Sequence, residues 1–307
     1  MIYHFILNPK SGRRGKLQNL EDEIKEACRK RKLSYHIYYT VATGDATAYV
    51  RSMVRISGER QRFLCIGGDG TINEIVNSAP CNENVEFGVI PNGSGNDFVR
   101  NFSNKENLFD IDAQIDGETV SLDLIRVNDT YCVNMVNIGF DCAVVREADR
   151  LKNKKLVTPG FSYIAGVAVV LCRKFGTKMK LLYDDGTVID SVLTLTAIGN
   201  GRFCGGGFMA CPKAKLQDGK MDICAIKKVT RRKFITLVSS YKAGTYLENK
   251  RAMEVINYRQ ESHFRMEFEE PVPICVDGEI SGAKNVEFTV VPNAFRFVVP
   301  KGSELLI

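Results

Sequence analysis

One glycine-rich segment of the chain combines residues that could bind a polyphosphate. It reads LCIGGDGTINEIVN, from Leu64 to Asn77, and places Asp69 among three glycines directly after an apolar run. Glycine has no Cβ atom, so backbone N–H groups in such a loop can approach phosphate oxygens closely. A helical pattern begins at Thr71, and the start of a helix offers unpaired N–H donors and the positive end of its dipole. Because a carboxylate also suits Mg²⁺, the segment predicts a nucleoside triphosphate site.

Three further polar segments each follow an apolar, strand-like run: Asn8–Gly12 (NPKSG), Thr40, and Pro91–Asp97 (PNGSGND). The first could add a positive charge and a hydroxyl, and the last could add a second acid for Mg²⁺. Each segment alone indicates only a turn, because glycine, asparagine and proline are common in turns. Four such segments at one edge of a parallel sheet are a stronger signal, since that edge is where these sheets bind ligands.

The common nucleotide-binding motifs are absent from the sequence. There is no G-x-x-x-x-G-K-[ST], which excludes a Walker P-loop. The third glycine of G-x-G-x-x-G would fall at Asn73 when counted from Gly68, and at Phe98 when counted from Gly93, so the Rossmann fingerprint is missing. The H-R-D set of protein kinases is missing too.

A second acidic motif, CVDGEIS, contains Asp277 and Glu279. Two residues apart, they would share one face of an extended strand. One carboxylate could then accept a proton from a hydroxyl group while the other orients it. The alternative is a hairpin turn at Asp277-Gly278.

The segment AKLQDGKMDI, from Ala214 to Ile223, places Asp218 and Asp222 around a glycine. It is compatible with a tight turn, or with a structural divalent-metal loop that uses Asp218 and backbone carbonyls. Basic residues cluster at Arg150–Lys155 and at Lys227–Lys233. Such clusters either form a solvated face or attract anionic lipid headgroups.

The first third of the chain alternates strand-like and helical patterns, which predicts a largely parallel sheet covered by helices. The expected strands and helices, in chain order, are 3–8, 17–31, 34–40, 45–57, 62–66, 71–79, 85–90 and 96–102. After about Val120, strand-like runs separated by turn signals dominate and predict a mainly antiparallel sandwich. Two helices are expected within it, at 161–175 and 231–248.

Composition sets limits on the class of protein. A length of 307 residues favours about two domains. The net charge of +6 suits an anionic ligand or an acidic membrane surface but does not by itself indicate nucleic acid. The ten cysteines form no C-x-x-C pair, which argues against a zinc finger. No secretory signal is visible, and the longest apolar run, Tyr163–Cys172, is shorter than the roughly 20 residues that span a bilayer.

Taken together, the motifs GGDGTINEIVN, PNGSGNDFVRN, NPKSGRRG, GNGRFCGGGF and CVDGE resemble the diacylglycerol kinase catalytic family. The soluble bacterial lipid kinases (diacylglycerol kinase or YegS-like) are the nearest members, and sphingosine and ceramide kinases are more distant. The resemblance implies an α/β class protein with two domains. Residues 1–124 would form an α/β ATP-binding domain like that of the nicotinamide-dinucleotide kinases, to which residues 293–307 return. Residues 125–292 would form a β-sandwich that binds the lipid substrate.

The resemblance also implies roles for individual residues. Glu279 matches the catalytic proton acceptor with Asp277 beside it, and Asp69 is both catalytic and a metal ligand. Mg²⁺ would be organised by Asp69, Asp97 and Asp123. A structural Mg²⁺ would bind the Asp218 side chain and the backbone carbonyls of Lys215 and Lys220. The positions expected to bind ATP are Asn8, Pro9, Lys10, Ser11, Gly12, Thr40, Gly67, Gly68, Asp69, Gly70, Thr71, Ile72, Asn73 and Ser94.

The function expected from these observations is an ATP- and Mg²⁺-dependent lipid kinase that converts diacylglycerol to phosphatidic acid. Alternatives are a kinase of another lipid (phosphatidylglycerol or a sphingoid base), a kinase of a soluble hydroxyl compound, or a non-catalytic module that senses nucleotide or lipid. The expected partners are ATP and a lipid at the membrane surface, with no transmembrane span and no nucleic acid. The family favours a homodimer. The expected location is the cytoplasm, with peripheral association to the membrane.

Overall fold

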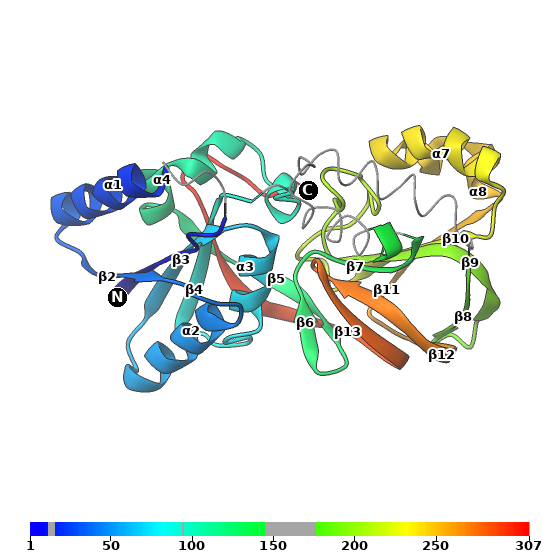
Figure 1. Ribbon diagram of the computed structural model, residues 1–307, viewed down its shortest axis with the longest axis horizontal. Helices are drawn as coiled ribbons and strands as arrows, with labels where there is room; N and C mark the ends of the chain where they lie inside the picture. Colours follow the sequence, from blue (N-terminus) through cyan, green and yellow to red (C-terminus); the bar gives the residue numbers. More distant parts are fainter. Residues whose placement is uncertain (12–15, 94, 141, 145–175, 307) are drawn as a thin grey trace. The chain divides into compact units, whose positions relative to one another are not determined.

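The computed structural model describes residues 1–11, 16–93, 95–140, 142–144 and 176–306 (Figure 1). The predicted site residues Gly12 and Ser94, the expected helix 161–175 and the basic segment 150–155 lie outside these ranges. The chain divides into two compact units, residues 1–124 with 291–307, and residues 125–290. Each unit is described by itself below.

The first unit contains the predicted parallel sheet. Its strand order is β2-β1-β3-β4, all parallel, and the end of β13 pairs with β4 through Phe297 and Phe87. The strand bounds are β1 Ile2–Leu7, β2 Ser34–Tyr39, β3 Gln61–Gly67, β4 Val85–Pro91 and β13 Glu279–Val299. The four predicted strands are therefore confirmed.

Helices cover both faces of this sheet, as Figure 1 shows. Helices α1 and α4 pack on one face through side chains such as Ile24 and Ile111, against Phe5, Leu64 and Ile66. Helices α2 and α3 contact each other on the opposite face. The helix bounds in this unit are α1 Lys16–Arg31, α2 Asp45–Ile56, α3 Asp69–Val76, η1 Phe98–Asn101, η2 Lys105–Phe109 and α4 Ile111–Ile115, of which η1 and η2 are 3₁₀ turns. Strand β5 Glu118–Val127 begins in this unit and ends in the second.

A buried ion pair attaches the returning C-terminal strand to this sheet. Glu86 on β4 accepts from the guanidinium of Arg62 at 2.8 Å and from that of Arg296 at 3.1 Å. Arg62 also donates to the backbone oxygen of Ile115 at 2.9 Å, at the end of α4. Because buried charges must be paired, this network favours one position for the end of β13 in the first unit.

The second unit is built from antiparallel strands, which confirms the predicted architecture. The order is β11-β10-β9-β7-β12-β13, and β8 pairs with both β12 and β9. The bounds are β6 Thr130–Cys132, β7 Met135–Gly139, β8 Thr177–Tyr183, β9 Val188–Gly199, β10 Met221–Lys227, β11 Ile256–Glu261 and β12 His263–Val276. Helix α7 Arg231–Ala243, the 3₁₀ turn η3 Thr245–Glu248 and α8 Lys250–Met253 complete the described part.

Successive side chains along a strand point to opposite faces of the sheet. In the β9–β10 pair, the side chains on both faces are buried. Ile198 and Ile223 belong to the core between the strands, whereas their neighbours Ala197 and Cys224 belong to the core under α7. The predicted helix 231–248 is confirmed, except that α7 stops at Gly244, which adopts φ +73 and ends the helix.

A histidine on β12 links two neighbouring segments of the second unit. His263 contacts Asp184 at 2.7 Å through Nδ1 and Glu287 at 3.0 Å through Nε2. Partial burial of the ring would lower the pKa of His263, but bonds to the two carboxylates outweigh this effect and raise it. The nine cysteines in the described ranges are free thiols, and eight of them are buried, as expected for small hydrophobic side chains.

Candidate functional site

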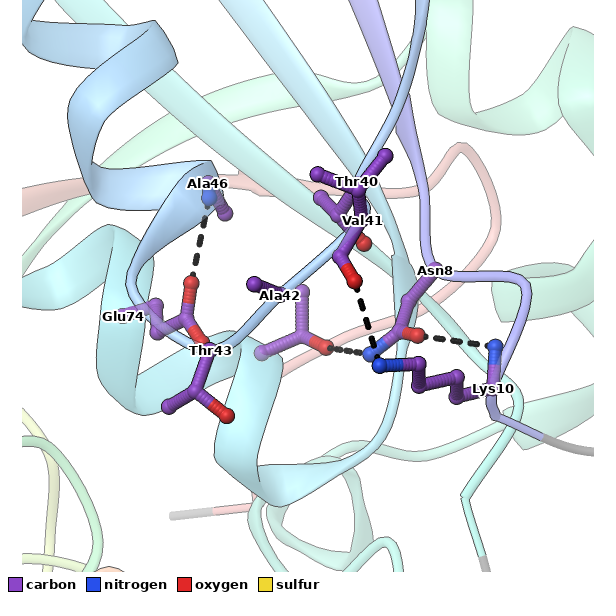
Figure 2. Close-up of a pocket in the computed structure, with 9 residues that line it drawn as sticks. Asn8, Lys10, Thr40, Val41, Ala42, Thr43, Ala46 and Glu74 are labelled. Carbon is purple, nitrogen blue, oxygen red and sulfur yellow. Dashed lines mark hydrogen bonds between the residues drawn. The ribbon is translucent and has the colours of Figure 1, made fainter.

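A pocket opens at the carboxyl ends of β1, β2 and β3 (Figure 2). It encloses about 380 Å³ of atom-free space. The structure brings four predicted nucleotide-site residues together in its wall: Asn8, Lys10, Thr40 and Thr71. The remaining lining residues are Val41, Ala42, Thr43, Ala46 and Glu74. The pocket therefore joins loops that follow three different strands, as expected for a ligand site of a parallel sheet.

The loop after β1 is held against the start of α3. Asn8 donates through Nδ2 to Thr71 Oγ1 at 3.3 Å, and its Oδ1 accepts from the backbone N–H of Lys10 at 3.0 Å. Ser11 Oγ donates to the backbone oxygen of Asn8 at 2.9 Å. The Lys10 side chain reaches across the pocket and donates to the Val41 oxygen at 3.1 Å, as Figure 2 shows. Its ammonium group thus lies where it could contribute charge to an anionic ligand.

Glycines after β3 and β4 allow their two loops to touch. A Cβ atom on Gly68 would lie 2.9 Å from the Cα of Gly93, and one on Gly93 would lie 2.6 Å from the Cα of Gly68. A Cβ on Gly67 would lie 2.3 Å from Thr71 Oγ1. The sequence argument explained these glycines by the approach of phosphate. Contact between protein segments already requires glycine at these three positions, whether or not a ligand binds.

Two predicted metal ligands are brought together by the same loops. The backbone N–H of Asp97 donates to Asp69 Oδ1 at 3.0 Å. A Cβ on Gly95, between the two acids, would lie 2.8 Å from Asp69 Oδ2 and 3.6 Å from Asp97 Oδ2. The guanidinium of Arg100 lies 3.2 Å from Asp97 Oδ1. The structure thus forms an acidic pair at the start of α3.

The chemistry of this pair fits Mg²⁺, which prefers carboxylate oxygens and keeps several waters. Within the described ranges, no group of three or more acidic, histidine or cysteine side chains could hold a metal ion. Asp123, the third predicted ligand, is buried on β5 and accepts from the backbone N–H of Asn293 at 2.9 Å. Its convergence with Asp69 and Asp97 stays a prediction.

The structure decides between the two interpretations of the acidic motif in the second unit. Asp277 and Gly278 adopt φ values of +47 and +96 and form the tight turn between β12 and β13. The segment is therefore a hairpin turn, as the second interpretation of the sequence predicted, and not an extended strand. Asp277 is buried, whereas Glu279 is exposed at the start of β13. Two consecutive residues with positive φ are typical of the tight turns that reverse the chain in a hairpin.

The buried carboxylate of Asp277 organises a neighbouring segment. Its oxygens accept from the backbone N–H groups of Val133 at 2.8 Å, Asn134 at 3.1 Å and Met135 at 2.9 Å, and from the Cys132 thiol at 3.2 Å. Burial raises the pKa of Asp277, and the bonds from these donors act in the opposite direction. The side chain is thus occupied in holding residues 132–135.

The GNGRFCGGGF motif forms hydrogen bonds with the same segment, residues 132–135. The backbone N–H of Asn200 donates to the oxygen of Asn134 at 2.9 Å, and Asn200 Nδ2 donates to the oxygen of Val133 at 2.8 Å. Asn134 Nδ2 in turn donates to the oxygen of Phe203 at 2.9 Å. The hairpin turn that precedes Glu279 is therefore part of a connected network of three segments in the second unit.

The predicted structural metal loop forms a tight turn. The backbone N–H of Lys220 donates to Asp218 Oδ1 at 3.1 Å, and Gly219 has φ +70. The cation at this loop, with the carbonyls of Lys215 and Lys220, stays a prediction. The nearby Asp222 is buried and bonded to Tyr258 and Gln260, and burial raises its pKa to about 6.

Two features of the structure were not predicted. The first is Glu74, whose carboxylate lines the pocket and bonds to the start of α2. The residue belongs to the GGDGTINE motif, but nothing in the sequence shows that α3 and α2 pack together. The second is an apolar cavity in the second unit, between α7 and the sheet. Its lining includes Phe140, Leu195, Phe208, Ile226, Phe234 and Leu237.

Two family models match this chain, and the boundary between them lies close to the boundary between the two units. Residues 3–127 match the family model described as the diacylglycerol kinase catalytic domain. Residues 134–299 match that of the YegS C-terminal NAD kinase beta sandwich-like domain.

Among curated proteins, the chain is 28% identical to "Probable lipid kinase YegS-like" of Yersinia enterocolitica, covering 95% of this chain and 94% of the relative. It is 27% identical to a diacylglycerol kinase of Bacillus subtilis, covering 96% and 95%. The crystal structure of a diacylglycerol kinase from Bacillus anthracis superposes with a TM-score of 0.69 at 21% identity, covering 97% of both chains. This last likeness concerns the fold alone.

Proposed function

This chain belongs to the diacylglycerol kinase catalytic family, with a YegS-type C-terminal domain, and we propose that it is an ATP- and Mg²⁺-dependent lipid kinase. The reaction transfers the γ-phosphoryl group of ATP to the hydroxyl of a membrane lipid. Diacylglycerol is the proposed acceptor and phosphatidic acid the product. The observation that carries the nucleotide part is the pocket at the strand ends, whose wall includes Thr71 of α3, the helix that begins at Asp69.

Phosphoryl transfer depends on positioning the triphosphate and neutralising its charge. Lys10 would contribute a positive charge, and N–H groups at the start of α3 would bind phosphate oxygens. Asp69 and Asp97 would hold Mg²⁺, which when bound neutralises charge that develops on the transferred group. Asp123 and the remaining predicted positions, including Gly12 and Ser94, complete the proposed site through the family resemblance.

Glu279 is the proposed proton acceptor. Its exposed position at the start of β13 leaves the carboxylate accessible to a hydroxyl group. The acceptor oxygen forms a bond to the γ-phosphorus, while the bond from that phosphorus to the β–γ bridging oxygen breaks and ADP leaves with its electron pair. The hydroxyl proton passes to Glu279. Asp277 would act through the hairpin turn and not on the substrate.

The apolar cavity in the second unit supports a lipid acceptor over a soluble one. The lining of this cavity is almost entirely apolar. Ligand pockets are lined mainly by hydrophobic and aromatic side chains. Polar groups that would recognise a soluble dinucleotide are scarce there, whereas an acyl chain needs none. We propose that the cavity receives part of an acyl chain.

Basic residues at the start of α7 support docking at an anionic membrane surface. Lys227, Lys228, Arg231 and Arg232 are exposed, and Ile235 on the same helix is 62% exposed. Cationic side chains near anionic headgroups attract the protein to the surface, at about 1 kcal/mol per charge. Within the described ranges, no helix has both the length and the apolar character needed to cross a membrane. We propose peripheral association in the cytoplasm.

Radiolabel transfer tests this function. The purified protein is incubated with γ-labelled ATP, Mg²⁺ and mixed micelles that contain diacylglycerol, phosphatidylglycerol or a sphingoid base, with a soluble dinucleotide in a separate arm. Glu279→Gln should abolish transfer but leave ATP binding intact. Glu270→Gln, which alters an exposed glutamate on the adjacent strand β12, is the matched control and should keep full activity.

Label in diacylglycerol that is lost only in Glu279→Gln would support the proposal. Label in a different lipid would correct the acceptor and keep the reaction class. Label in the dinucleotide alone would favour a soluble-substrate kinase. A folded protein that binds ATP and labels no acceptor would favour a sensing module.

A further inference from the structure

Helix α2 begins beside the pocket without a side-chain cap of its own. Its N-cap residue is Gly44, which has φ +83 and no side chain that could accept a hydrogen bond. The first N–H groups of a helix have no partner within the helix, so they need acceptors from elsewhere. Glu74 of α3 supplies them, because its Oε1 accepts from the Gly44 N–H at 3.0 Å and its Oε2 from the Ala46 N–H at 3.1 Å.

The same two helices are connected by a second bond at this point. Thr47 Oγ1 donates to the backbone oxygen of Glu74 at 2.8 Å. The preceding loop, residues 41–44, is held from its other end, where Asp45 accepts from the Val41 N–H at 2.8 Å. The carboxylate of Glu74 therefore joins the second end of this loop to α3 through two backbone N–H groups.

This loop forms one wall of the pocket, and α3 forms another. Val41, Ala42, Thr43 and Ala46 line the first wall, while Thr71 and Glu74 line the second. Figure 2 shows the bond from Ala46 to the Glu74 carboxylate at the edge of the pocket. Since α3 starts at Asp69, Glu74 connects the loop wall to the helix that carries the proposed metal ligand.

We propose that Glu74 is a positioning residue of the nucleotide pocket, which holds residues 41–46 in the conformation that receives ATP. Both of its carboxylate oxygens already accept backbone N–H groups, so it acts through the loop and need not touch the nucleotide. The inference rests on the proposed nucleotide site, but it does not depend on which hydroxyl compound is the acceptor.

The consequence is a selective loss of nucleotide affinity. A hydrogen bond to a charged group contributes more than a neutral one, and without Glu74 the loop must be ordered at the moment of binding. We expect Glu74→Ala to weaken ATP binding about tenfold. Glu74→Gln should have an intermediate effect, because its amide keeps one acceptor oxygen but turns an NH₂ group toward the second N–H. In both variants KM for ATP should rise while kcat changes little.

The experiment measures binding of ATP with Mg²⁺ to the full chain by isothermal titration calorimetry, together with KM and kcat for transfer. Arg51→Ala is the matched control. Arg51 joins the same two helices away from the pocket, through its bonds to the backbone oxygens of Asn77 at 2.9 Å and Ser78 at 3.3 Å. Arg51→Ala should lower the melting temperature by about as much as Glu74→Ala does. It should leave the affinity for ATP unchanged.

Weakened binding in the Glu74 variants with normal binding in Arg51→Ala would support the inference. Unchanged affinity in Glu74→Ala would overturn it while leaving the proposed function in place. Equal weakening in Arg51→Ala would also overturn it, because loosening of the two helices in general would then explain the effect. If the wild-type chain binds no ATP, the proposed nucleotide site fails and this inference fails with it.

Discussion

Replacing Asp277 with asparagine would remove one acceptor oxygen from a buried set of donors and keep the backbone conformation. Asparagine tolerates the left-handed φ of +47 that this position requires, so the substitution adds little backbone strain. Oδ2 accepts from the Val133 N–H at 2.8 Å, and an amide NH₂ in its place would leave that donor buried without an acceptor. An unsatisfied buried donor costs about 1–3 kcal/mol.

The other acceptor oxygen would be kept in weaker form. Oδ1 accepts from the backbone N–H groups of Asn134 and Met135 and from the Cys132 thiol, and these bonds would lose their ionic character. Charge-assisted hydrogen bonds are roughly twice as strong as neutral ones. Adding both effects, we expect Asp277→Asn to lower the free energy of unfolding by about 3 kcal/mol.

Urea unfolding monitored by circular dichroism is the assay. With a slope of about 1–3 kcal/mol per M, the midpoint should fall by about 1 M or more. Glu279→Gln is the control, because it changes an exposed acid two residues away and should alter stability by less than about 0.5 kcal/mol. A midpoint in Asp277→Asn equal to that of the wild type would refute the role assigned to the Asp277 network.

Three further outcomes follow from the site and the fold. Asp69→Asn should lower kcat for phosphoryl transfer by about 10²-fold or more in a protein with wild-type circular dichroism, and wild-type turnover would remove this acid from the mechanism. Gly93→Ala should lower the free energy of unfolding by about 1–3 kcal/mol, because its Cβ would lie 2.6 Å from the Gly68 backbone, whereas Gly58→Ala meets nothing within 4 Å and should be neutral in the same melting experiment. His263 has a raised pKa in the folded protein, so its stabilisation is complete below the unfolded pKa of about 6.5 and disappears as pH rises through the folded pKa. His263→Gln should therefore reduce stability by about 1 kcal/mol at pH 5.5 and by much less near pH 9, and an equal reduction at both pH values in urea titrations would contradict this.

Local patterns in the sequence were sufficient for most of the fold. Strands β1, β3 and β4 of the first unit are apolar runs that lie inside a covered sheet, so their type could be predicted without tertiary information. The helix at 231–248 was predictable because its apolar side chains recur with helical spacing, and Gly244 shows where it ends. The loops at the strand ends could be predicted as candidate ligand-binding segments because glycine, asparagine and acidic residues occur together there.

Other properties depended on contacts between segments far apart in the chain. The sequence could not distinguish an extended strand from a turn at Asp277, because the outcome depends on the donors of residues 132–135 that bind its carboxylate. The place of Glu74 in the pocket could not be predicted from the sequence. Its hydrogen-bond partners, Gly44 and Ala46, are about thirty positions away in the chain and come within reach of Glu74 only when α2 and α3 pack together.

The sequence by itself determined the two-unit architecture, the order of elements and the polar, glycine-rich character of the loops at the strand ends, because these follow from side-chain periodicity and local backbone preference. Only the tertiary structure decided which carboxylates face solvent and which hold the backbone in place. It also decided that Gly68 and Gly93 touch and that α7 covers an apolar cavity. These features depend on the pairing of strands and the packing of helices, which bring together atoms that no local pattern relates.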